Sequence, residues 1–152
     1  MAAAVSNRQR RVRVSTPRLR ATAEAALCAL GRADRDVDVS VVDDLAIRRL
    51  NSRYLRRRTA TDVLAFDLDA PGPSRLLGEV IVSADTARRQ AKQAGVPVAL
   101  ELDLLVVHGL LHLAGWDDSR PREARLMHQR AREILAGAGR RAPARLWHGL
   151  LA

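Results

Sequence analysis

The segment from His108 to Asp118, HGLLHLAGWDD, holds the side chains best suited to chemistry. His108 and His112 are four residues apart in an apolar run, so one face of a helix carries both imidazoles. Gly115 permits a turn that brings Asp118 back toward them. Two imidazoles, one carboxylate and an open position make a catalytic zinc site, in which the pKa of bound water falls to about 7. The spacing therefore predicts a metal-dependent hydrolase.

A metzincin-like peptidase is one interpretation of the same spacing. Its pattern HExxHxxGxxH matches His108, His112, Gly115 and, as third ligand, Asp118. Gly109 stands where that pattern needs a Glu as general base, which disfavours a peptidase. Ordinary helix histidines are the other alternative, but two imidazoles on an apolar helix need polar partners.

Start and stop signals predict the elements that position this motif. Pro97 begins the long helix with both histidines, and Ser119 caps a last helix that runs to Leu135 with Pro121 in its first turn. Three more helices are predicted: one from Thr16-Pro17 to Gly31, one that begins after Asp43 or Asp44, and one over 85–94 that ends before Gly95. The second of these is expected to turn Leu45, Ile47 or Arg48, and Leu50 toward the core. Strands are predicted at 12–14, 37–42, 63–68 and 76–83, the last of alternating type. The order indicates an α+β fold: a single domain with a small mixed β-sheet packed with helices.

Composition indicates one domain with an aliphatic core, because the 152 residues are 47% hydrophobic and only 3% aromatic. The single cysteine, Cys28, excludes a disulfide framework, which is compatible with a reducing cytoplasm, and we expect it to be a buried core thiol. No apolar run reaches the roughly 20 residues of a membrane span, and the N-terminus lacks the apolar core of a secretory signal. The domain is expected over 12–137, between a basic N-terminal arm at 1–11 and a loose C-terminal tail at 138–152 in which LWHGLL can dock.

The net charge of +9 indicates a polyanionic partner, with a solvated basic surface as the alternative. One basic cluster consists of Arg53, Arg56, Arg57 and Arg58, and another of Arg88, Arg89 and Lys92. Arginine binds phosphate bidentately, so these residues are predicted to contact a nucleic-acid backbone. The scarcity of aromatic side chains argues against base-specific contacts.

Three ordered blocks carry a family resemblance. HGLLHLAGWDD resembles HGxLHLxGxDH, the signature of the YbeY family of metal-dependent endoribonucleases that mature rRNA in bacteria. Leu50-Asn51 and TDVLAF at 61–66 resemble that family's LN…PTDVLSF, and LLGEVIVS at 76–83 resembles its lGdIvIS strand. The resemblance spans about 39–135. It implies one zinc-type ion, single-strand-specific cleavage in 16S-type rRNA maturation, the ribosome or its small subunit as partner, and a cytoplasmic location.

The chain departs from the family pattern at two positions. Asp118 replaces the third His; a carboxylate binds zinc at a similar distance but adds negative charge, so the ion is expected to be a weaker Lewis acid. His128 and His148 are alternative third ligands. Asp117, which the family shares, is interpreted as a residue behind the ligands that orients one of them or shapes the turn.

The second departure is Leu55, where the family has an arginine thought to serve catalysis. Arg56 is expected to take over the stabilisation of charge on the phosphate. If it does not, the alternative is a ribosome-associated RNA-binding protein that keeps a structural metal and has lost cleavage.

Overall fold

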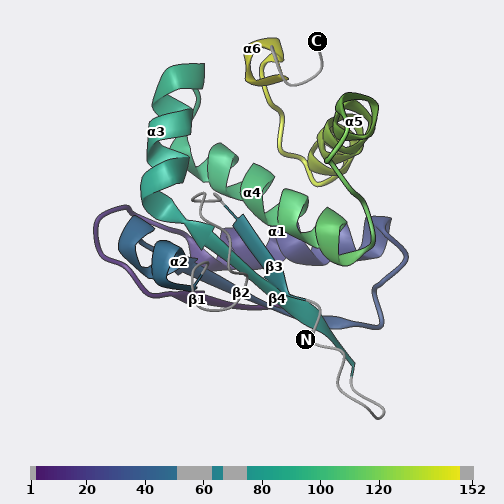
Figure 1. Cartoon of the computed structure of the whole chain (residues 1–152), viewed down its shortest axis with the longest axis horizontal. Coiled ribbons are helices and arrows are strands. Elements are labelled where there is room, and N and C mark those ends of the chain that lie inside the picture. Colours follow the sequence, from purple (N-terminus) through teal and green to yellow (C-terminus); the bar gives the residue numbers. More distant parts are fainter. Residues whose placement is uncertain (1–2, 51–62, 67–74, 148–152) are drawn as a thin grey trace.

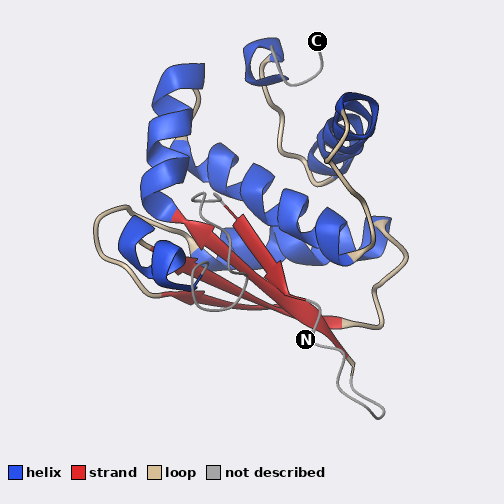
Figure 2. Cartoon of the chain, viewed as in Figure 1, coloured by secondary structure: helices blue, strands red, loops and turns tan. Residues whose placement is uncertain are grey.

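A mixed four-stranded sheet forms the centre of the part of the chain that the computed structural model describes, residues 3–50, 63–66 and 75–147. Its order is β1-β2-β4-β3. The first three of these run parallel and β3 pairs antiparallel with β4, with Ala65 opposite Val80. The strands are β1 (Ala3–Asn7), β2 (Asp36–Val42), β3 (Val63–Phe66) and β4 (Leu76–Ser83). With the helices around it, this sheet confirms the predicted α+β class (Figure 2).

Helices cover the sheet and form an outer layer. The described helices are α1 (Thr16–Ala29), α2 (Asp44–Leu50), α3 (Ala84–Ala94), α4 (Val98–Leu113), α5 (Pro121–Gly137) and α6 (Ala144–Trp147). Helix α4 lies across the sheet next to α1, and α5 packs on α1 and α4 from outside (Figure 1). Helix α2 packs on β4, where Val42, Ile47 and Ile81 form a separate small core. The helix with the two histidines is thus held between the sheet and α5.

Local sequence signals set several helix ends. The Ser15 hydroxyl caps α1 by accepting a hydrogen bond from the Arg18 amide, one residue before the predicted start of this helix at Thr16. The Ser83 hydroxyl caps α3 in the same way, by accepting from the Thr86 amide. Gly95 ends α3 at a φ of 68°, a conformation that favours glycine. These helices agree with the predicted ones to within one or two residues.

The first strand lies earlier than predicted. The prediction of a strand at 12–14 is wrong, because β1 occupies Ala3–Asn7 inside the expected basic arm. The Gln9 side chain accepts from the Arg11 and Val12 amides and donates to the Val12 carbonyl. These bonds occupy backbone groups that a strand would need, and Val12 reaches the core from a connection.

Burial differs from the prediction at three places. Cys28 is exposed, because α1 buries Leu27 and Ala26, and the next position points about 100° away from Leu27. In α2, Ile47 is buried but Leu45 is 54% exposed, so only part of the predicted inner face is correct. Strand β4 is buried on both faces along its second half, not alternating, because it lies between two strands and α2 covers its other side.

A buried carboxylate ties three parts of the chain together. Asp103 of α4 is fully buried and accepts hydrogen bonds from Arg18 at 2.7 and 3.0 Å and from the Thr22 hydroxyl at 2.9 Å. Arg140 lies 3.6 Å from the same carboxylate and donates to the Thr22 hydroxyl. Leu146 is also buried, which agrees with the expectation that LWHGLL can dock.

Membrane-span criteria of length and hydropathy are met by no single helix among the described residues. Helices α3 and α4 meet them only as a pair bent by 117°.

Candidate metal centre

His108 and His112 project from the last two turns of α4 and face each other. Their Nε2 atoms are 3.1 Å apart, and their ring planes cross at 84°. Both side chains are partly buried, at 18% and 29% exposed. The predicted helical i, i+4 pair therefore brings two imidazole nitrogens to one point.

The turn after α4 fixes the orientation of His112. Gly115 adopts a φ of 100°, and the Trp116 amide then donates back to the Leu111 carbonyl. The Trp116 carbonyl lies 3.1 Å from His112 Nδ1. Because a carbonyl only accepts, Nδ1 carries the proton, and the lone pair of Nε2 faces His108.

Asp118 completes the cluster from the far side of the turn. Its Oδ2 lies 3.4 Å from His108 Nε2 and 3.6 Å from His112 Nε2. Atoms bound to one zinc ion at about 2.1 Å in tetrahedral geometry are about 3.4 Å apart, which the three measured separations match. At 38% exposed, the Asp118 carboxylate leaves the cluster open to solvent on its side. The residues present therefore fit a zinc-type ion with an open coordination position.

Burial keeps His108 neutral. Burial of its ring, reinforced by the neighbouring His112 and His128, lowers the pKa of His108 to about 4, although Asp118 opposes the shift. A neutral imidazole offers a lone pair, as a metal ligand must. At neutral pH this side chain is therefore ready to bind an ion without first losing a proton.

His128 of α5 adjoins the cluster. Its ring stacks on that of His108 with centroids 5.9 Å apart and planes at 21°, and its buried Nδ1 finds no hydrogen-bond partner among the described residues. Among the described residues, the side chains whose donor atoms lie close enough to share one metal ion are those of His108, His112 and Asp118. His148, the other alternative ligand, lies outside the described residues.

Asp117 supports the loop next to the cluster. Its carboxylate accepts from the Ser119 amide at 3.1 Å and from the Ser119 hydroxyl at 2.8 Å, and these bonds lower the pKa of Asp117. The prediction that Ser119 caps α5 is wrong, because Arg120 stands at that position and the Ser119 hydroxyl is bound to Asp117. The contacts place Asp117 in the turn that carries Asp118.

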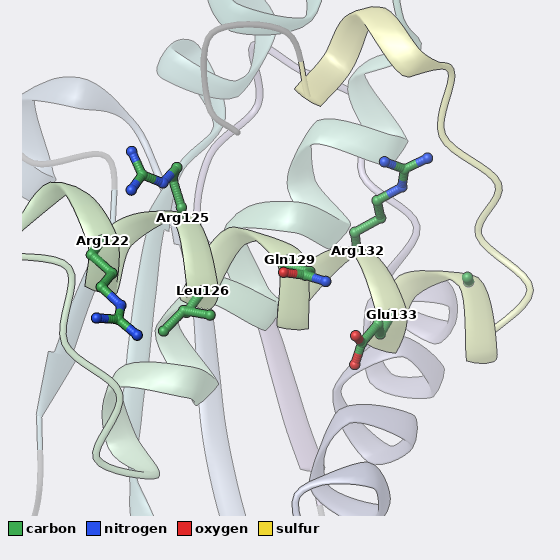
Figure 3. A pocket seen from close by; sticks show the side chains of 7 residues that line it. Arg122, Arg125, Leu126, Gln129, Arg132 and Glu133 are labelled. Carbon is green, nitrogen blue, oxygen red and sulfur yellow. The ribbon is translucent and has the colours of Figure 1, made fainter. Parts of the chain in front are cut away.

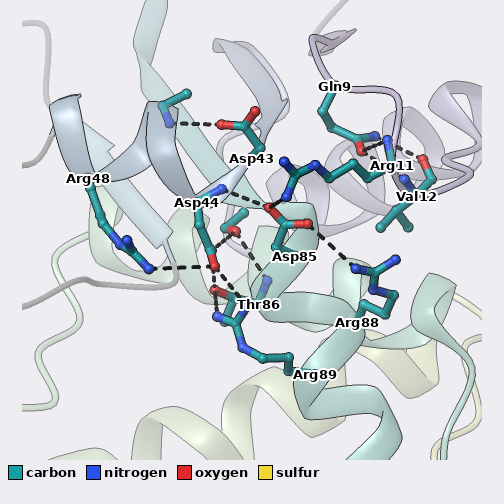
Figure 4. Close-up of polar contacts among 12 residues, drawn as sticks. Gln9, Arg11, Val12, Asp43, Asp44, Arg48, Asp85, Thr86, Arg88 and Arg89 are labelled. Carbon is teal, nitrogen blue, oxygen red and sulfur yellow. Dashed lines mark hydrogen bonds and ion pairs between the residues drawn. The ribbon is translucent and has the colours of Figure 1, made fainter.

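The predicted RNA-binding arginines divide into two groups. Arg53, Arg56, Arg57 and Arg58, together with Leu55, lie outside the described residues. Arg88 and Arg89 of α3 are exposed but lie beside carboxylates (Figure 4). Arg89 Nη1 donates to Asp44 at 2.7 Å, and Arg88 Nη2 is 3.9 Å from Asp85. Much of their charge is therefore compensated within the protein.

Sequence reasoning missed one basic surface, on α5. Arg122, Arg125 and Arg132 recur at three- and seven-residue spacing along one side of this helix, a signal that was present in the sequence.

Fold and cluster together define a single-domain α+β protein with a candidate three-ligand metal centre on a helix and its following loop. A family model, Endoribonuclease YbeY, matches residues 4–139. The chain belongs to the YbeY family of endoribonucleases, which are hydrolases.

Individual relatives agree with this assignment. The chain is 44% identical over 143 residues to an Endoribonuclease YbeY of Geobacter metallireducens, covering 90% of this chain and 95% of the relative. It is 44% identical over 140 residues to one from an Anaeromyxobacter species, covering 91% and 73%. The solution structure of a Thermotoga maritima protein has the same fold, with a TM-score of 0.58 at 22% identity over 97% of this chain and 90% of that one.

Proposed function

We propose that this chain is a single-strand-specific, zinc-dependent endoribonuclease of 16S-type rRNA maturation and ribosome assembly, which acts in the cytoplasm on RNA of the small ribosomal subunit. The observation that carries the proposal is the convergence of three donor atoms, from His108, His112 and Asp118, at tetrahedral spacing. Family membership supports RNA as the substrate.

The three ligands would hold one zinc ion or another divalent metal, which when bound supplies Lewis acidity at the scissile phosphate. The chain's own contribution is to orient the donors. The Trp116 carbonyl holds the Nδ1 proton of His112, and burial keeps His108 unprotonated. Asp117, through Ser119, keeps the loop of Asp118 in shape.

We assign to Arg56 the stabilisation of negative charge on the reacting phosphate. Contacts to the RNA backbone are assigned to Arg53, Arg57 and Arg58. These four residues lie outside the described part of the chain, so their assignment rests on the sequence. Arg88 and Arg89 are assigned to RNA as well, in competition with Asp85 and Asp44.

The test compares the wild type with His108→Ala and, as a surface control, Gln93→Ala, which changes an exposed side chain of α3 that has no predicted role in binding. Purified wild type and control should each carry about one metal ion per chain and cut single-stranded rRNA while sparing a duplex. His108→Ala should lose both metal and cleavage. Equal cleavage by His108→Ala would refute the proposal, and RNA binding without cleavage in the wild type would favour the ribosome-associated binding protein.

A further inference from the structure

The outward face of α5 carries exposed arginines that pair with no carboxylate among the described residues. Arg122, Arg125 and Arg132, here called the arginine stripe, line an open hollow of about 660 Å³ together with Gln129 and Leu126 (Figure 3). Glu133 also lines the hollow, but Arg130 Nη1 lies 3.1 Å from its carboxylate and compensates its charge. The stripe therefore presents uncompensated positive charge.

The arginine stripe runs beside the candidate metal centre. At 3.6 residues per turn, Arg125 and Arg132 stand about one turn before and one turn after His128, on the same side of α5. Figure 3 shows these two side chains directed to a common side of the helix. Since the His128 ring stacks on His108, Arg125 and Arg132 flank a residue that adjoins the metal cluster.

We propose that the arginine stripe binds the backbone of single-stranded RNA next to the cleaved bond, so that α5 guides the strand to the metal centre. This inference rests on the proposed function. Guanidinium groups bind phosphate oxygens bidentately, without regard to base. From Arg122 to Arg132 the helix rises about 15 Å, enough for several phosphates. Leu126, half exposed, offers an apolar contact to a sugar or base.

The composition of this face favours RNA over an anionic membrane. A helix that lies on a lipid surface buries a broad apolar face. Among the described residues that line the hollow, only Leu126 and Ala136 are apolar. The face therefore supplies charge without the apolar area that insertion needs.

The test replaces the stripe with helix-compatible neutral side chains in the variant Arg122→Gln/Arg125→Gln/Arg132→Gln. The control, Arg8→Gln/Arg10→Gln/Arg13→Gln, removes the same charge from the exposed β1–α1 connection, on the opposite side of the molecule from α5 (Figure 1). Both use the full, metal-loaded chain, and circular dichroism checks their helix content. The probe is a fluorescent single-stranded DNA of about 20 nucleotides, which keeps the phosphates but offers a ribonuclease no substrate.

The stripe variant should bind the probe roughly 10- to 100-fold more weakly at about 0.1 M salt, with a salt slope shallower by about 2. On single-stranded rRNA its KM should rise while kcat stays near the wild-type value. Equally weakened probe binding in the control would show that the effect comes from the net charge of the protein and would overturn the proposal. Lost binding to phosphatidylserine vesicles with unchanged nucleic-acid binding would overturn it in favour of a lipid surface. Stripe-dependent binding in a wild type that cuts no RNA would refute the proposed function alone.

Discussion

His112 points its Nδ1 at the carbonyl of Trp116, 3.1 Å away, so the backbone of the turn after α4 sets the direction of this imidazole. The turn in turn depends on Gly115 at a φ of 100°. A position with no catalytic side chain therefore controls the geometry of the centre.

Gly115→Ala should weaken metal binding. Open space surrounds the position, so the cost is backbone strain of about 1–3 kcal/mol, which the turn can relieve by withdrawing the Trp116 carbonyl. We expect zinc affinity to fall about 10- to 100-fold by competition with a chelator. Gly137→Ala, at the end of α5 with equally open space and no positive φ, is the matched control and should leave zinc affinity unchanged. An equal change in zinc affinity in the two variants would contradict the proposed role of the Gly115 turn in orienting His112.

Replacement of Asp118 should separate ligand loss from ligand exchange. Asp118→Ala leaves two donors, and its zinc affinity should drop more than about 100-fold, beyond the loss expected for a supporting residue. Asp118→His replaces the carboxylate with the family's imidazole and should retain about one ion per chain. Asp117→Ala disturbs only the bonds to Ser119 and should cost about tenfold at most. Zinc bound equally by all three variants and the wild type would exclude Asp118 as a ligand.

Acid should remove the stabilisation that Asp44 gives. Partial burial raises the pKa of this carboxyl, but hydrogen bonds from Arg89, Ser83 and Thr86 outweigh it and lower the pKa from 3.8 to about 2. Because folding lowers this pKa, the contribution is complete above pH 3.8 and is lost as the pH falls toward 2.

In urea unfolding at pH 7, Asp44→Asn should therefore be less stable than wild type by about 1–2 kcal/mol, a figure discounted because Arg89 is exposed. The difference should shrink to a small fraction near pH 2, where the wild-type carboxyl is about half neutral. Asp38→Asn, exposed on β2, is the control. A difference that persists unchanged at pH 2 would assign the effect to packing.

Cys28 should behave as a surface thiol. A thiol reagent should modify it in the folded chain about as fast as in the unfolded chain, because it is exposed on α1. Cys28→Ser should change the free energy of unfolding by less than about 0.5 kcal/mol, whereas Leu27→Ala, one residue earlier and fully buried, should cost about 2–5 kcal/mol. Protection of Cys28 from the reagent in the folded chain would contradict its exposure and indicate a buried thiol.

The features that the sequence predicts well depend on neighbours within one or two helical turns. His108, His112 and Asp118 converge because an i, i+4 pair and a glycine turn are local geometry, and Gly95 ends α3 for the same reason. The predictions that fail depend on partners that local periodicity does not reveal. Hydrogen bonds from the Gln9 side chain occupy the backbone groups that a strand at Val12 would need, and the way α1 packs leaves Cys28 facing solvent. The relation between the arginine stripe and the centre arises only when α5 packs on α4.

The partners of the buried Asp103 carboxylate are made at different times during synthesis. Arg18 and Thr22, which hydrogen-bond it, precede it in the chain by more than 80 positions, while Arg140 follows it. As the chain leaves the ribosome, α4 can meet α1 early, but its charge gains the third partner only after residue 140 has been made. We therefore expect the full set of contacts around the helix that bears both histidines to form only late in translation.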